Sequence, residues 1–182
     1  MTVSPSLRAA RALLVEAGAD RIPHPGGTLL AHLDRVHARL AAWDARPALR
    51  LAGLCHACYG TDGFPEPLLP LDRRADLAAV IGAEAEEIVR RYAGCAREAT
   101  YPTLDGPDAR FHDRFTGTAV PATAAETRDF AELTAANELD LAAENPDFRA
   151  RHGSDLLALF TRLRPLLTEA AWTDCRTLLG QT

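Results

Sequence analysis

Residues 51–61, which read LAGLCHACYGT, contain no charged side chain. A helix at the surface of a globular protein carries a polar face, so a helix through this run must be surrounded by protein on every side. We predict that residues 48–60 form the central helix of the domain. The other segments must then supply amphipathic helices that cover it.

The flanking segments carry many helix signals and almost no strand signal. Ser4 and Pro5 begin a first helix that Gly18 ends, and Thr28 caps a second helix that ends near Asp44. Residues 75–82, 83–96, 126–145, 155–164 and 169–179 are also predicted to be helical, with boundaries at Gly82, at the capping box of Thr123 and Glu126, and at Pro146, Ser154, Pro165, Thr168 and Gly180. The pattern predicts one all-α domain over residues 1–182, a bundle of seven or eight helices.

Composition restricts the partners of the chain. The 20 basic residues are all arginines, they are scattered along the sequence, and 25 acidic residues leave a formal net charge of -5. A nucleic-acid partner is therefore not expected. No run approaches the roughly 18 apolar residues of a membrane span, and the N-terminus lacks a signal-peptide pattern, so we expect a cytoplasmic protein.

Four cysteines lie in apolar surroundings, and we expect them to be reduced packing residues. Cys55 and Cys58 have the spacing of a redox or zinc motif, but they are predicted to lie within a helix and have no second cysteine pair. The sequence indicates no oligomeric state.

Polar side chains stand on three predicted apolar helix faces. His32 lies between Leu29 and Val36, His56 lies within the uncharged helix, and Asn137 occupies the middle of an apolar stripe with Asp140 at its edge. Groups of this kind that converge in a dry helical bundle can form a substrate or metal site. We predict a shared pocket, and the alternative is that each group bonds to neighbouring main chain.

Other residues are candidates for the border of this pocket. His24 precedes a Pro-Gly-Gly turn that could bring it to the pocket mouth, and Tyr59 and Thr61 follow the uncharged helix. Residues 100–121 have no regular period and are a candidate lid, in which Arg110 and Arg114 would clamp an anionic substrate. An ordinary solvated loop explains the same residues equally well.

Several motifs together resemble an uncharacterised bacterial family whose layout is similar to the HD superfamily of metal-dependent phosphohydrolases. They are HPGGTLLAHL, the following Trp43, LAGLCHACYGTDGF, VIGAEAEEIV and FAELTAANELDL. The resemblance implies an HD-like helical bundle. It matches His32 to the first histidine ligand, His56 with Ala57 to the His-Asp pair, and Asn137 to the late aspartate.

Two of the four metal ligands implied by this resemblance are changed, because Ala57 cannot bind a cation and Asn137 offers only a neutral carbonyl. A single divalent ion, iron, zinc or manganese, held by His24, His32, His56 and Asp140 would repair the site, and Asp62 could also restore negative charge. The other outcome is a site without metal, in which the histidines act as general acid or base.

The sequence therefore predicts a small-molecule enzyme with a histidine-lined pocket, either a metal-assisted hydrolase or an oxygenase. His24, His32, His56, Asn137 and Asp140 are the expected catalytic residues. The competing hypothesis is a non-catalytic ligand-binding or accessory protein on an HD-like fold that has lost its metal. In both cases the partner is a small molecule, and the arginines of residues 100–121 favour an anionic one.

Overall fold

The computed structural model describes residues 4–180, which form nine α-helices and two small antiparallel sheets. The helices are α1 (Pro5–Glu16), α2 (Leu29–Ala42), α3 (Pro47–Cys55), α4 (Arg74–Ile81), α5 (Ala83–Gly94), α6 (Arg97–Thr100), α7 (Ala124–Glu144), α8 (Pro146–Arg162) and α9 (Glu169–Leu179). The sheets are hairpins of β1 (Pro23–His24) with β2 (Gly27–Thr28) and of β3 (Arg110–Asp113) with β4 (Thr118–Pro121). The predominantly helical fold is confirmed, but the predicted number of helices was too low.

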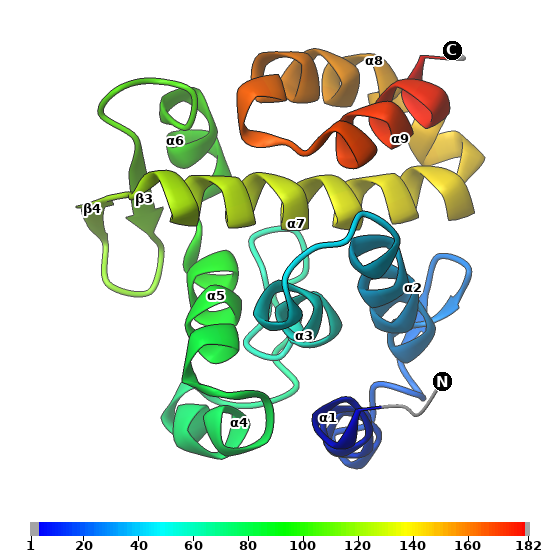
Figure 1. Ribbon diagram of the computed structural model, residues 1–182. Coiled ribbons are helices and arrows are strands. Elements are labelled where there is room, and N and C mark those ends of the chain that lie inside the picture. The colour runs from blue at the N-terminus through cyan, green and yellow to red at the C-terminus, as the bar shows by residue number, and fades with distance from the viewer. Residues whose placement is uncertain (1–3, 181–182) are drawn as a thin grey trace.

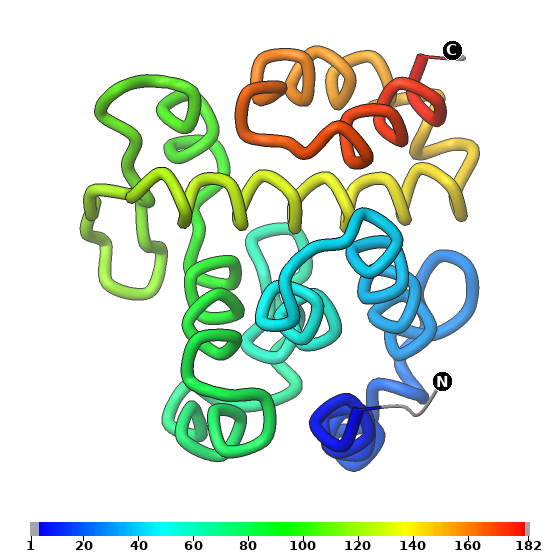
Figure 2. Tube along the Cα trace, in the orientation of Figure 1, coloured from blue at the N-terminus to red at the C-terminus, as the bar shows by residue number. Residues whose placement is uncertain are grey.

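Helix α7 crosses the middle of the molecule, with α8 and α9 on one side and α1 to α5 on the other (Figure 1). The chain completes the α1 to α5 side first, passes through α6 and the β3–β4 hairpin at one end of α7, and then returns along α7 (Figure 2). None of the helices within residues 4–180 combines the length and apolarity that a membrane crossing requires.

Helix α7 is buried on nearly all sides because it packs against α2, α3 and α5 on one side and α8 and α9 on the other. Small side chains such as Ala131, Ala135 and Ala136 are fully buried and allow close helix packing. The prediction that the central helix lies over residues 48–60 was therefore wrong, because α7 takes the central position. The charged residues of α7 suggested an exposed helix. In the structure, each of the buried charged residues has a specific hydrogen-bond partner.

Helix α3 is buried as predicted, but it is shorter than predicted and ends at Cys55. A turn follows, in which the Cys58 amide donates to the Cys55 carbonyl and Gly60 adopts a φ of +69°. A Cβ atom on Gly60 would lie 2.8 Å from the Pro65 carbonyl oxygen, so the turn requires glycine there. This turn places His56 at the end of α3 rather than within it.

Helix α8 begins earlier than predicted. Asn145 caps it by accepting a hydrogen bond from the Phe148 amide, and Pro146 occupies its first turn. Ser154 therefore lies inside the helix and is not its N-cap. The capping box of Thr123 and Glu126 at the start of α7 is confirmed.

Residues 100–121 are more regular than the sequence suggested. The β3–β4 hairpin packs against α5, where the Arg114 amide donates to the Gly94 carbonyl at 2.7 Å and Phe111 is 3% exposed. Thr100 ties the segment to α6 by accepting a bond from the His112 amide. The sequence around Phe111 is too short to distinguish a strand from an irregular loop that contains aromatic residues.

Candidate functional site

His32 and Asp140 form a buried pair between α2 and α7. The Nδ1 atom of His32 lies 2.6 Å from Oδ2 of Asp140, and each residue is 1% exposed. Arg35, one turn further along α2, donates to both carboxylate oxygens at 2.7 and 2.9 Å. Burial alone would raise the pKa of Asp140, but the bonds from His32 and Arg35 outweigh it and hold that pKa below its ordinary value. Asp140 is therefore an ionised acceptor that orients His32.

His56 faces His32 from the end of α3. Its Nδ1 atom lies 2.8 Å from the Gly53 carbonyl oxygen, which can only accept, so Nδ1 carries the proton and Nε2 carries a lone pair. The Nε2 atoms of His56 and His32 are 3.4 Å apart. Burial, and then the nearby His32, lower the pKa of His56 to about 3. His56 is neutral at neutral pH.

Asn137 adds a third acceptor to the same point. Its Nδ2 atom donates to Oε1 of Glu138 at 3.1 Å, which turns its Oδ1 atom toward Nε2 of His32, also at 3.1 Å. When His32 is neutral, its Nδ1 proton is directed at Asp140 and its Nε2 is a lone pair as well. The two Nε2 atoms and the Asn137 carbonyl oxygen then meet without a hydrogen-bond donor between them.

His24 lies on β1 and stacks on His32, with ring centroids 4.2 Å apart. Its buried Nδ1 atom has no hydrogen-bond partner among the described residues. Burial, and then His32, lower the pKa of His24 to about 4, against the opposite influence of the Pro25 carbonyl. Arg35 fixes the β1–β2 turn by donating to the carbonyls of Pro25 and Gly26. One arginine thus holds both Asp140 and the turn that carries His24.

These histidines line a cavity of about 400 Å³, a volume suited to a small organic molecule. Its polar wall consists of His24, His32, His56, Thr61, Arg97, Asn137 and Glu138. Its apolar wall includes Pro23, Leu29, Ala57, Phe64, Leu141 and Phe148. The cavity therefore combines a concentrated polar end with apolar walls.

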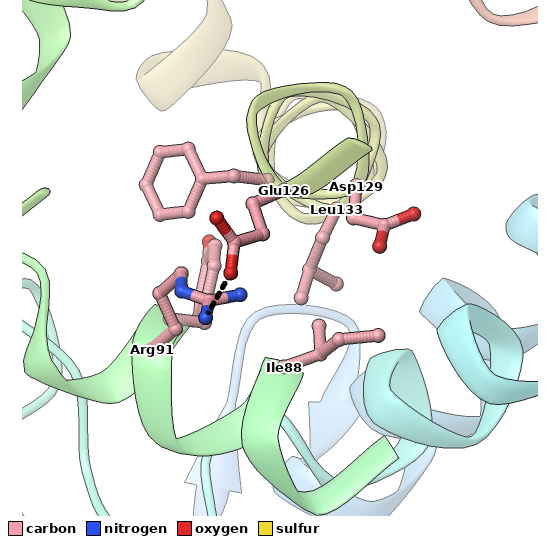
Figure 3. A pocket seen from close by; sticks show the side chains of 7 residues that line it. Ile88, Arg91, Glu126, Asp129 and Leu133 are labelled. Atoms are coloured by element: carbon pink, nitrogen blue, oxygen red, sulfur yellow. Dashed lines mark hydrogen bonds and ion pairs between the residues drawn. The ribbon is translucent and has the colours of Figure 1, made fainter. Parts of the chain in front are cut away.

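A hollow between α5 and α7 provides a contrast (Figure 3). Its volume is about 10 Å³, enough for about one water molecule. Arg91 and Glu126 form an ion pair across it at 2.6 Å, and Ile88 and Leu133 point toward each other beside them. This hollow is too small to bind a metabolite.

The structure brings together five of the predicted site residues, His24, His32, His56, Asn137 and Asp140, although Asp140 stands behind His32 and not at the cavity wall. Thr61 lines the cavity as predicted. Tyr59 does not line it, because its hydroxyl donates to Glu86 at 2.9 Å.

Arg110 and Arg114 were predicted to bind the substrate, and the structure places them elsewhere. Both lie on or next to the β3–β4 hairpin, outside the cavity wall. Arg114 donates to the Ala93 carbonyl and lies over the Phe115 ring. These two arginines are therefore not placed to bind a ligand in this cavity.

Three charged residues of the site were not predicted from the sequence. Arg35 binds Asp140, and Arg97 forms an ion pair with Glu138 at 3.0 Å beside the cavity. Charged residues at helical spacing resemble an ordinary solvated face. The one available signal was the position of Arg35, which lies three residues after His32 and therefore on a neighbouring part of the same helix surface.

The predicted metal ligands are not arranged as a coordination sphere. Within residues 4–180, no group of three or more His, Cys, Asp or Glu side chains is placed to hold a metal ion. Both oxygens of Asp140 are bound by His32 and Arg35, and Asp62 accepts from the Arg97 amide. The side-chain atoms that do converge are two imidazole nitrogens and one amide oxygen, whereas a hard divalent ion prefers carboxylate oxygens.

The cysteines of the described chain are buried free thiols. A contact with Cys58, and then burial, raise the pKa of the Cys55 thiol. A protonated, enclosed thiol is a poor nucleophile and a poor ligand. Cys55 and Cys58 are therefore packing residues at the end of α3.

Several of the cavity residues lie in a segment that matches a known family profile. Residues 13–97 match a family profile described as a domain of unknown function (DUF6817). The matched segment contains His24, His32, His56 and Arg97, but it ends before α7, so Asn137 and Asp140 lie outside it. A comparison with curated proteins finds no match.

Proposed function

We propose that the protein is a small-molecule enzyme in which His32 acts as a general base. The observation that carries the proposal is the convergence of three acceptors, Nε2 of His32, Nε2 of His56 and Oδ1 of Asn137, at the wall of a 400 Å³ cavity. Such a group of lone pairs attracts a hydrogen-bond donor. A hydroxyl or amine of the ligand supplies that donor.

The division of roles follows from the contacts of each imidazole. A proton that leaves the ligand and binds Nε2 of His32 places a positive charge next to the Asp140 carboxylate, 2.6 Å away. His56 has no such carboxylate, and burial keeps it neutral. His32 is therefore the base, Asp140 orients it, and His56 and Asn137 position the donor group of the ligand.

We further propose that the fold is HD-like, that the protein acts in the cytoplasm, and that it has no nucleic-acid partner. Support for the HD-like relation comes from the order of His32 on α2, His56 after α3 and Asn137 on α7, since these residues meet at one point. Both oxygens of Asp140 are bound by His32 and Arg35, and no metal-holding group is present within residues 4–180, so we favour chemistry by the side chains themselves over a metal-assisted hydrolase or oxygenase.

The test compares conversion of small molecules by matched variants. The protein is incubated with a library of small hydroxyl- and amine-bearing compounds, and consumption of each is followed by mass spectrometry. We expect His32→Gln to lower the rate for the converted compound by about a hundredfold. His37→Gln is the control, because His37 lies on the same helix but not at the cavity, and we expect it to retain the rate.

Two results would contradict the proposal. Equal rates for the His32→Gln and wild-type proteins would exclude His32 as the base, and binding of a compound without conversion would favour a ligand-binding or accessory protein. Metal analysis after purification without chelator or nickel resin tests the metal-assisted class. About one equivalent of iron, zinc or manganese that is lost in His32→Gln but kept in His37→Gln would favour that class.

A further inference from the structure

A second cavity adjoins the histidine cavity. Its volume is about 280 Å³, and it lies between α8 and the segment that includes Arg97 and Tyr101. Three residues, Arg97, Glu138 and Phe148, line both cavities. The two spaces are therefore neighbours along one wall.

The second cavity differs from the first in chemistry. Along α8 its wall combines three half-buried apolar side chains that pack against the core, Phe148, Leu156 and Leu159, with the exposed His152 and Asp155. Tyr101 also lines it. Leu156 and Leu159 are three residues apart and so share one face of the helix. Because this wall is partly exposed, an apolar group placed against it would be withdrawn from water.

Arg97 and Glu138 mark the boundary between the two cavities. Their side chains are 25% and 8% exposed and form an ion pair at 3.0 Å, while a second guanidinium nitrogen of Arg97 lies 3.5 Å from the Tyr92 hydroxyl. A guanidinium has five N–H donors, so these two contacts leave donors for a ligand. The pair is neutral as a whole, which favours an uncharged acceptor over a strongly anionic group.

We propose that the ligand spans both cavities, as a hydroxyl-bearing molecule with an apolar arm. This inference rests on the proposed function and deepens it by naming a ligand class. The hydroxyl donates its single proton to Nε2 of His32, its oxygen or a neighbouring carbonyl accepts from Arg97, and the apolar arm lies along Phe148, Leu156 and Leu159. The second cavity is thus a specificity subsite for the length of the arm.

The experiment measures the affinity of straight-chain alcohols from butanol to decanol by calorimetry. For the wild-type protein we expect each added methylene that reaches the second cavity to tighten binding by about fourfold. Leu156→Trp fills the cavity, so we expect it to weaken decanol binding by at least about tenfold and to leave butanol binding unchanged. Ala158→Trp is the control, because Ala158 is exposed on the same helix.

The outcomes separate this inference from the proposed function. Three results would overturn the inference. They are wild-type affinity of Leu156→Trp for decanol, alcohol affinities that do not depend on chain length, and no binding of any alcohol. Leu159→Trp repeats the test if Leu156→Trp does not fold. His32→Gln reports on the proposed function: we expect it to weaken all members equally, and an unchanged series would contradict the role of His32 while leaving the subsite intact.

Discussion

His32 has a different environment at each of its ring nitrogens. One nitrogen is held by an ionised carboxylate inside the protein, and the other faces the cavity together with His56 and Asn137. The carboxylate fixes the ring orientation and the tautomer. At the residue scale, the site is therefore an oriented imidazole with its second ring nitrogen at the cavity wall.

The neutral state of His56 has a consequence for stability that can be measured. Its pKa is about 3 in the folded chain and 6.5 without the protein environment. Between these values the unfolded chain binds a proton that the folded chain does not, so the free energy of unfolding falls as the pH falls from 6.5 toward 3. This one group contributes a slope of up to about 1.4 kcal/mol per pH unit.

We expect His56→Asn to lose this part of the pH dependence, because asparagine does not titrate and its amide can still donate to Gly53. Urea unfolding at a series of pH values measures the slope. His152→Asn, at an exposed histidine of α8, should keep the wild-type slope. A wild-type slope in His56→Asn would show that His56 is not a buried neutral imidazole.

At the scale of elements, the turn after α3 determines where the wall of the cavity lies. Gly60 has a φ of +69° and its backbone lies close to the Pro65 carbonyl, which brings Thr61 and Phe64 to the cavity. Hydrogen bonds between the main chains of Thr61 and Phe64 close the turn. The position of this wall depends on a close backbone approach.

Gly60→Ala should therefore be strongly destabilising. We expect a loss of at least about 2 kcal/mol in the free energy of unfolding, because the new Cβ adds a backbone clash to an unfavourable positive φ. Gly82→Ala is a matched control, with a φ of +88° and no atom within 4 Å of the new Cβ. Chemical denaturation should show a smaller loss of about 1 kcal/mol for Gly82→Ala. Equal losses would show that the approach to Pro65 is unimportant.

The same elements show which parts of the structure the sequence could predict. His32, His56 and Asn137 interrupt apolar patterns, and a polar group at a core position needs a partner, so their convergence was predictable. Arg97 and Glu138 were not, because their pairing joins α6 to α7 across 41 residues and each looks like a surface charge. The buried position of α7 was hidden for the same reason: Glu132, Glu138 and Asp140 are charged, and only the fold provides their partners.

At the scale of the whole molecule, α7 joins the two halves of the site. The α1 to α5 side provides the three histidines, α7 provides Asn137 and Asp140, and α8 provides the apolar wall of the second cavity. The segment that matches the family profile therefore contains only part of the site. The remainder of the chain completes it by orienting His32 and by closing the cavity.

Nitrogen NMR of histidine-labelled protein tests the orientation of His32 most directly. In mildly alkaline buffer we predict that both His32 and His56 carry a proton on Nδ1 and a lone pair on Nε2. In the Asp140→Asn variant we expect only the His32 signals to change. When butanol is added to the wild-type protein, the His32 Nε2 resonance should shift. A proton on Nε2 of His32 in the wild-type protein, or an Nε2 resonance that ignores both Asp140→Asn and butanol, would contradict the role proposed for His32.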